Sequence, residues 1–179
     1  MKSSTFQELL RRYQNRIYSY AYYFLRNRED AEDVTQEVFI RCWQSCEATE
    51  WKGMLAWMIR VAHNLCIDVK RRRKRTAIQR NNTEAEYLTV LRERNRATTD
   101  PELLLQLDQT QQILLDAMEE LPDRTRSYLL LHYFQGLTYR EIGQITLTNT
   151  NTVKVQVHRG KQALKQILAG SLNEQSQKG

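Results

Sequence analysis

Residues 138–160 read TYREIGQITLTNTNTVKVQVHRG, and this stretch decides the fold of the C-terminal part of the chain. Thr138 and Glu141 form a capping box, in which a hydroxyl and a carboxylate satisfy N–H groups at a helix start. Two isoleucines give this short helix an apolar side, and a tight turn then ends at Asn149, a good N-cap. A longer helix with a polar, cationic outer side extends to about Leu168. The pattern predicts a helix-turn-helix, with an ordinary helical hairpin as the alternative.

The residues upstream of this motif also show helix boundaries. Asp100 as N-cap and Pro101 at the first helical position predict a helix start, and Leu121-Pro122 predicts its end. A further helix should close at Gly136, because glycine readily takes the left-handed conformation of the C′ position. The C-terminal part is therefore expected to be entirely helical.

The N-terminal part shows three more helical patterns. A second capping box, Thr5 to Glu8, predicts the start of the first helix, and residues 26–28 interrupt its apolar periodicity. The second helix carries acidic residues in its first turns, where the helix dipole favours them. After a loop at 44–53, a third helix is predicted from Met54 to Arg75, ending in six consecutive cations.

Residues 76–98 lose this periodicity and are rich in Asn, Thr, Glu and Arg, which predicts a flexible linker. The fold class that follows is all-α, with two small helical domains joined by that linker. The expected boundaries are a first domain at 1–75, a linker at 76–100, a second domain at 101–170 and a tail at 171–179.

Composition and charge narrow the class of function. The 179 residues carry a net charge of +6, and only 6 Gly and 2 Pro argue against a turn-rich β fold. Residues 1–80 sum to +7, residues 81–120 to −6 and residues 121–179 to +5. Two basic ends favour contacts with a polyanion such as nucleic acid, although a solvated surface is the alternative. An odd cysteine count and the absence of a signal-peptide core or long apolar run lead us to expect a cytoplasmic protein.

Three motifs in order resemble those of extracytoplasmic-function (ECF) sigma factors. The first is DAEDVTQEVF at 30–39 followed by Trp43, and the second is WMIRVAHN at 57–64 with Asp68, Arg71 and Arg72. The third comprises Leu121-Pro122, YFQGLTYREI at 133–142, Thr152-Val-Lys154 and His158-Arg159. The resemblance implies sigma domains two and four in a subunit that binds core RNA polymerase, recognises the −35 and −10 promoter elements and opens the duplex. It also implies that an anti-sigma factor controls the protein and that it needs no cofactor.

The resemblance assigns a polymerase-binding surface to the second helix. The residues that would face the clamp helices of the beta-prime subunit are Asp33, Gln36, Glu37 and Ile40. Their spacing of three and four places them beside the apolar stripe, and their carboxylates suit a basic partner. A solvated acidic side is the alternative. The flap of the beta subunit is the second expected polymerase contact.

The resemblance assigns −10 recognition to the loop and the third helix. The residues concerned are Trp51, Arg60, His63, Asn64, Lys70, Arg71 and Arg72. Aromatic and arginine side chains can stack on unstacked bases, and asparagine can read adenine. The cation run would hold phosphates and contribute affinity rather than sequence information. Trp51 could instead fold back on the core, and a basic helix end is also favoured by the dipole.

Recognition of the −35 element is assigned to the helix-turn-helix. The residues concerned are Arg140, Asn151, Thr152, Lys154, Val155, His158 and Arg159. Residues near the start of such a helix reach base edges, whereas Arg140 is better placed for a phosphate. Three positions of this motif depart from the family pattern: Leu147 replaces the usual turn glycine, Gln156 a common basic residue and Gly160 a typical alanine; elsewhere, Met54 stands where an aromatic residue is frequent. Leu147 puts the turn geometry in question, and Gly160 should weaken its helix.

Other functions are less consistent with the residues. Cys42, Cys46, His63 and Cys66 have helical spacings that could suit zinc, but small buried thiols are the commoner case. No catalytic triad, Walker motif or paired carboxylates are present, so an enzyme is not expected. The main rival is a helix-turn-helix repressor or activator that binds two equivalent half-sites as a dimer. An adaptor without a DNA role is a further rival, which the basic ends disfavour.

Overall fold

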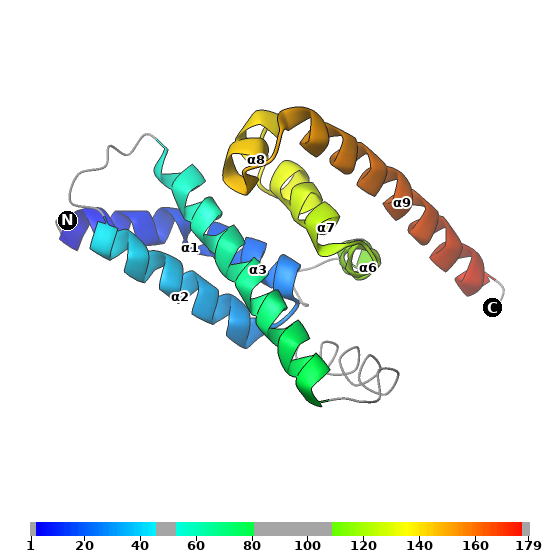
Figure 1. The fold of residues 1–179 in the computed structure, drawn as a ribbon, viewed down its shortest axis with the longest axis horizontal. Helices are drawn as coiled ribbons and strands as arrows, with labels where there is room; N and C mark the ends of the chain where they lie inside the picture. Colours follow the sequence, from blue (N-terminus) through cyan, green and yellow to red (C-terminus); the bar gives the residue numbers. More distant parts are fainter. Residues whose placement is uncertain (1–2, 46–52, 81–108, 177–179) are drawn as a thin grey trace. The chain divides into compact units, whose positions relative to one another are not determined.

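The computed structural model describes residues 3–45, 53–80 and 109–176. They fall into two compact units, one within Met1–Asp100 and the other within Pro101–Gly179. The described residues are helical and include no strand, which confirms the predicted all-α class (Figure 1).

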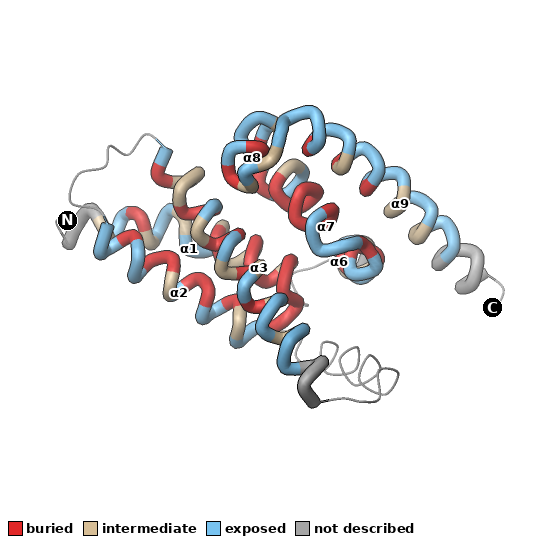
Figure 2. Tube along the Cα trace, viewed as in Figure 1, coloured by how far each residue is buried: buried red, intermediate tan, exposed pale blue. Residues whose placement is uncertain are grey.

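The first unit is a bundle of three helices, each of which contacts the other two. They are α1 (Ser3–Leu25), α2 (Arg28–Ser45) and α3 (Met54–Arg80). Their buried sides meet in the middle of the bundle (Figure 2). The fully buried core residues of this unit include Ile17, Tyr20, Phe24, Ala31, Val38, Cys42, Met58, Ile59, Ala62 and Cys66.

The predicted break between the first two helices is confirmed, and a tight connection makes it. Arg26 takes the left-handed conformation, with φ of 53°, and its N–H donates to the Tyr22 carbonyl at 2.7 Å. Asn27 then caps α2, because its side-chain oxygen accepts from the Asp30 N–H at 2.9 Å. Two helices can therefore pack side by side with almost no loop between them.

Two predicted boundaries in the first unit differ from the structure. α1 begins at Ser3, so Thr5 lies inside the helix rather than at its start. α3 continues to Arg80, so residues 76–80 are helix and not linker. The reason is that Lys, Arg, Ala, Ile and Gln all tolerate a helix interior, and no Gly or Pro stops it before residue 80. The remainder of the predicted linker and the predicted helix start at Asp100 and Pro101 lie outside the described residues.

The described part of the second unit contains the long helix α9 and four shorter helical elements. They are α6 (Gln109–Glu119), α7 (Asp123–Leu129), the π-helix η1 (Leu130–Phe134), α8 (Tyr139–Thr146) and α9 (Thr150–Ser176). α9 runs past the predicted end near Leu168, so much of the expected tail is helical. No sequence pattern predicted the π-helix, which closes with the Gln135 N–H donating to the Leu130 carbonyl at 3.1 Å. Gly136 follows with φ of 68°, as predicted for a C′ residue.

A buried arginine closes the end of α6. The guanidinium of Arg126 is 4% exposed and donates to the carbonyls of Met118, Glu119 and Leu121 at 3.0, 2.8 and 3.3 Å. Met118 and Glu119 belong to the last turn of α6 and Leu121 follows it, so the helix itself offers these carbonyls no N–H partner. Arg126 therefore joins α7 to the end of α6 through hydrogen bonds to its backbone.

Gly160 has a packing role that the sequence did not reveal. A Cβ at this position would lie 2.5 Å from Cγ2 of Thr125 and 3.2 Å from Cδ1 of Leu129. Because only glycine permits this approach, α7 and α9 can pack closely. The predicted weakening of the helix is accompanied by a gain in packing between two helices.

Candidate nucleic-acid and polymerase interfaces

The helix-turn-helix is formed as predicted, and hydrogen bonds fix both of its helix starts. The Thr138 hydroxyl accepts from the Glu141 N–H at 3.3 Å, while the Glu141 carboxylate accepts from the Thr138 N–H at 2.8 Å. Bonds from the Thr138 side chain and backbone lower the pKa of Glu141, which keeps this carboxylate ionised. Asn149 caps α9 by accepting from the Asn151 N–H at 2.8 Å.

The turn between α8 and α9 retains left-handed geometry without glycine. Leu147 has φ of 52°, and its side chain is 88% exposed. The adjacent Thr148 N–H donates to the Gly143 carbonyl at 2.9 Å. A Cβ on Gly143 would lie 2.6 Å from the Thr148 carbonyl oxygen, so glycine is required at this crossing. The turn therefore keeps the geometry that a glycine would give it, because Leu147 itself adopts the strained left-handed conformation.

α9 separates its residues into an inner and an outer side. Val153, Val157 and Gly160 are buried against the rest of the unit. The predicted −35 residues of this helix are all exposed, namely Asn151, Thr152, Lys154, Val155, His158 and Arg159. Arg140 is exposed on α8, and Gln156 instead turns inward, where its side-chain oxygen accepts from the Thr125 hydroxyl at 3.2 Å. The outer side thus combines two cations, amides and an exposed valine, the residue types that read a major groove.

Three residues that the sequence analysis did not single out connect the turn to α7. Nε of Arg124 donates to the Tyr128 hydroxyl at 2.8 Å, and Nη2 donates to the Thr148 hydroxyl at 3.1 Å. The Tyr128 hydroxyl donates to the same Thr148 oxygen at 3.1 Å. The spacing of Arg124 and Tyr128 on one helix could have suggested a pair, but only the fold brings Thr148 to it.

α3 exposes only part of the predicted −10 surface. Arg60 and Asn64 are exposed and lie one turn apart, and Arg71 and Arg72 are exposed further along the helix. His63 is 8% exposed, and its Nδ1 lies 2.9 Å from the Tyr20 hydroxyl. Burial lowers the pKa of His63 to about 4, so the imidazole is neutral near pH 7. A direct DNA contact by His63 would require this buried pair to open. Trp51 lies outside the described residues.

The six consecutive cations of α3 do not all have the same environment: one of them forms an ion pair within the bundle, and others are exposed to solvent. Arg73 forms an ion pair with Asp30, which links α3 to the first turn of α2. Arg71 and Arg72 are exposed, and Lys70 is half-buried. Asp68 lies 3.9 Å from Arg71, so a carboxylate shares this side of the helix. Lys74 and Arg75 are exposed as well, so the run offers phosphates four exposed cations, while Arg73 is held by Asp30.

The predicted polymerase surface of α2 is largely exposed. Asp33 and Gln36 face solvent, and Ile40 is 42% exposed, which is unusual for a large aliphatic side chain. Glu37 pairs with Arg41 at 2.7 Å between Oε1 and Nε. The surface is consequently an apolar centre with polar neighbours, and one of its two carboxylates already has a cation beside it.

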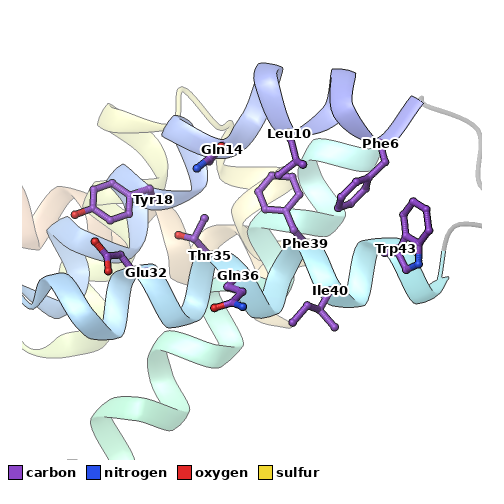
Figure 3. Close-up of a pocket in the computed structure, with 10 residues that line it drawn as sticks. All are labelled: Phe6, Leu10, Gln14, Tyr18, Glu32, Thr35, Gln36, Phe39, Ile40 and Trp43. Carbon is purple, nitrogen blue, oxygen red and sulfur yellow. The ribbon is translucent and has the colours of Figure 1, made fainter. Parts of the chain in front are cut away.

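A groove between α1 and α2 lies beside this surface and shares two of its residues, Gln36 and Ile40 (Figure 3). Its volume is about 510 Å³. The remaining lining residues are Phe6, Leu10, Gln14, Tyr18, Glu32, Thr35, Phe39 and Trp43. Phe6 meets Trp43 edge to face with ring centroids 5.0 Å apart, and Trp43 is 47% exposed. The groove therefore has an aromatic end and a polar end, which is a form suited to an amphipathic partner.

The second unit has an apolar groove of its own between η1, α6 and α9. Its volume is about 430 Å³. It is lined by Leu114, Met118, Leu129, Tyr133, Phe134, Lys161, Leu164, Lys165 and Leu168. Tyr133 and Phe134, which belong to the π-helix, are 54% and 39% exposed. Two lysines on the edge would favour a partner that is apolar in the middle and acidic at its margin.

The cysteines do not form a metal-ligating group in the part of the chain that the structure describes. Cys42 and Cys66 are buried free thiols, and burial raises the pKa of the Cys66 thiol. The described residues include no group of three His, Cys, Asp or Glu side chains that could hold a metal ion. Cys46 lies outside them. Among the described helices, none is both long and apolar enough to cross a membrane.

The fold and these surfaces define a two-unit helical protein with a helix-turn-helix in one unit and a groove with apolar lining in each. Comparison with known families is consistent with this class. Residues 9–76 match the family model of sigma-70 region 2, and residues 111–164 match that of sigma-70 region 4.

Comparison with individual relatives supports the same family. The chain is 31% identical over 169 residues to the ECF RNA polymerase sigma factor SigW of Bacillus subtilis, an alignment that covers 91% of this chain and 88% of SigW. It is 33% identical over 173 residues to the ECF RNA polymerase sigma factor SigE of Mycolicibacterium smegmatis, covering 97% of this chain but only 65% of SigE. The chain belongs to the sigma-70 family, as an ECF RNA polymerase sigma factor. Members of this family are regulators that recognise DNA and not enzymes.

Solved structures share the fold. The sigma factor RpoE, in complex with the anti-sigma factor NepR from Bartonella quintana, has a TM-score of 0.70 at 19% identity, over 92% of this chain and 97% of RpoE. CnrH, in complex with the cytosolic domain of CnrY, has a TM-score of 0.64 at 17% identity, over 94% of this chain and 90% of CnrH. At these identities the likeness concerns the fold.

Proposed function

We propose that this protein binds core RNA polymerase, recognises the −35 and −10 promoter elements and directs transcription initiation from them. The observation that carries the proposal is the exposed outer side of α9, the second helix of the helix-turn-helix. This side presents cations and amides to solvent, and Asn149 caps the helix at its start. A second unit with its own exposed cations and a partner surface distinguishes this function from that of a simple repressor. Such a role places the protein in the cytoplasm, with the polymerase and the promoter.

The −35 element would be read by α9. Asn151, Lys154 and Arg159 would reach base edges, because residues on the outer side near the start of a recognition helix enter the major groove. Val155 is 45% exposed and could contact a thymine methyl group. Thr152 and His158 would support these contacts, and Arg140 on α8 would bind a phosphate of the flanking backbone.

The −10 element would meet α3. Arg60 and Asn64 form the part of this surface that reaches bases, and Arg71 and Arg72 hold phosphates. We give His63 a different role from its neighbours. Because it is buried against Tyr20, it fixes the position of α3 against α1, which in turn fixes where Arg60 and Asn64 project. Trp51 and Lys70 remain part of the proposed surface.

Core polymerase would bind both units. Asp33, Gln36, Glu37 and Ile40 on α2 present an exposed apolar centre with polar neighbours to the clamp helices of the beta-prime subunit. The apolar groove between η1, α6 and α9 is the surface that we assign to the flap of the beta subunit. Two separate contacts on one chain would act as a bivalent attachment to the enzyme.

Control by an anti-sigma factor is part of the proposal. The structural neighbours RpoE and CnrH were both solved with a partner protein, and an anti-sigma factor is the partner of RpoE. The α1–α2 groove of this protein shares Gln36 and Ile40 with the proposed clamp surface. A helix seated in that groove would therefore exclude polymerase from the same residues, and inhibition would follow from competition.

Run-off transcription tests the proposal directly. The purified protein is mixed with sigma-free bacterial core polymerase and promoter fragments, including the one upstream of its own gene. Transcripts that depend on the protein are expected, and their start sites would give both promoter elements. The variant I40A should weaken co-elution with core polymerase, whereas K154A should leave co-elution intact and reduce transcription.

Two results would contradict the proposal. The absence of both protein-dependent transcripts and co-elution with core polymerase would contradict the proposed function. Specific binding of the protein alone to a palindromic operator, as a dimer on two equivalent half-sites, would establish the repressor instead.

A further inference from the structure

The three residues that connect the turn to α7 place a cation beside the recognition helix. The Tyr128 hydroxyl accepts from Nε of Arg124 and donates to Thr148, and the Thr148 hydroxyl donates onward to the Thr146 carbonyl at 3.1 Å. Thr148 also accepts from Nη2 of Arg124. Each hydroxyl thus donates one proton and each acceptor site is used once, so the arrangement is a fully satisfied network.

This network holds the guanidinium in a defined place while leaving it exposed. The Tyr128 side chain is 1% exposed and belongs to the core, so its hydroxyl is a rigid acceptor. The Arg124 guanidinium carbon lies 5.7 Å from the centre of the Tyr128 ring. A guanidinium has five N–H groups, and the contacts with Tyr128 and Thr148 use two of them. The others are available at the surface, because Arg124 is exposed.

The position of Thr148 indicates what those N–H groups would meet. Thr148 immediately precedes Asn149, the N-cap of α9. When the start of a recognition helix enters the major groove, the turn before it lies beside the sugar-phosphate backbone. A pre-positioned, planar cation at that point matches a phosphate group in charge and in geometry.

We propose that Arg124 is a phosphate-binding residue of the −35 interface, held in place across the helix-turn-helix by Tyr128 and Thr148. This inference rests on the proposed function. The contact supplies affinity and fixes how deeply α9 enters the groove, and it carries no base information of its own. Tyr128 and Thr148 are positioning residues, because they act through Arg124.

The test measures promoter binding by the full chain with core polymerase, on a promoter found by run-off transcription. R124A should weaken binding about tenfold, by a similar factor on different −35 sequences, and should reduce the slope of log K against log salt by about one. R124K should recover most of the salt slope, because it keeps the charge, but not all of the affinity, because lysine cannot form the fork. Y128F should change affinity in the same direction as R124A but less, because the cation remains.

The phosphate itself can be identified by a second substitution. Uncharged methylphosphonates are placed one at a time in the −35 backbone. One position should weaken the wild-type complex and leave the R124A complex unaffected, which is the coupling expected of a direct contact. R12A removes an exposed cation from α1 and serves as the matched loss of one charge, with no coupling expected at that position.

Several outcomes would overturn the inference. An unchanged salt slope in R124A, with a lowered melting temperature, would show that Arg124 only braces the turn. An R124A complex that remains sensitive at every methylphosphonate position would exclude a phosphate contact. In both cases wild-type promoter complexes would still form and the proposed function would stand. If the wild-type chain forms no promoter complex with core polymerase, the proposed function and this inference fail together.

Discussion

The recognition helix α9 and the helix α3 both present cations to solvent, but different interactions hold them in place. α9 starts where Asn149 caps it, and the preceding turn is tied to α7 through Thr148. α3 has no comparable cap among the described contacts and is positioned by packing, by the buried Tyr20–His63 pair and by the Arg73–Asp30 ion pair. The comparison teaches that hydrogen bonds at the helix start, one local and others to α7, set one surface, whereas packing and buried side-chain pairs along the helix set the other.

The largest expected effect is a loss of stability in the second unit that leaves the stability of the first unit unchanged. R126A removes the buried guanidinium that donates to three carbonyls at the end of α6, and we expect it to destabilise the second unit by about 3–5 kcal/mol. Circular dichroism should show early loss of helix. All three tryptophans, at 43, 51 and 57, lie in the first unit, so the fluorescence transition should stay in place. A fluorescence shift as large as the loss of helix would show that the units unfold together.

The first unit should depend on pH through His63. Its pKa is about 4 when folded and 6.5 in the reference state, so between these values the unfolded chain binds a proton that the folded chain does not. Stability should therefore fall as pH falls from about 6.5 towards 4, by an amount on the order of 3 kcal/mol. Denaturant titrations followed by tryptophan fluorescence at pH 7 and 4.5 measure this loss.

H63N is the control for that titration, because asparagine keeps a polar partner for Tyr20 but does not titrate. The variant should be less stable than wild type at pH 7 and should lose less stability on acidification. An equal loss in both proteins would assign the acid sensitivity to other groups.

A smaller effect is expected where α7 meets α9. G160A should destabilise the second unit by about 1–2 kcal/mol, because the clash with Thr125 outweighs the better helix propensity of alanine. Thermal melting by circular dichroism measures the change. G170A is the matched control on the same helix, since a Cβ there meets nothing within 4 Å. Stabilisation by both substitutions would mean that the two helices do not need the close approach.

The smallest expected effect has the opposite sign. L147G should stabilise the second unit by about 0.5–1 kcal/mol, since glycine relieves the left-handed strain and little packing is lost at a side chain that is 88% exposed. The gain is limited because glycine also increases the entropy of the unfolded chain. Chemical denaturation measures it, and a loss of stability would show that the leucine makes contacts in solution.

Much of the fold was predictable because its signals are short in range. The capping box at Thr138, the C′ glycine at 136 and the break at residues 26–28 each involve residues a few positions apart. The same is true of the outer side of α9, which follows from helical periodicity once Asn149 fixes the start. The ends of α3 and α9 were harder to place, since no Gly-Pro signal marks them and helix continues wherever nothing stops it.

The candidate site was predictable only where exposure follows from periodicity. Arg60 and Asn64 are exposed as expected, but His63 is one position away and is buried, because α1 lies against that side of α3. Arg73 belonged to a run that reads as uniform charge, and the structure gives it Asp30 as a partner. Arg124 carried only its four-residue spacing from Tyr128 as a signal, and no local pattern connected it to Thr148.

The sequence by itself determined the helical class, the capped helix-turn-helix and which residues lie on the outer side of α9. These features depend on residues that are close neighbours along the chain. The tertiary structure alone decided the burial of His63, the need for glycine at 160 and the connection of Arg124 to Thr148. Tyr20 and His63 are 43 positions apart, and Arg124 and Thr148 are 24 apart. Such pairs meet only when helices pack, since packing brings together residues that no local pattern links.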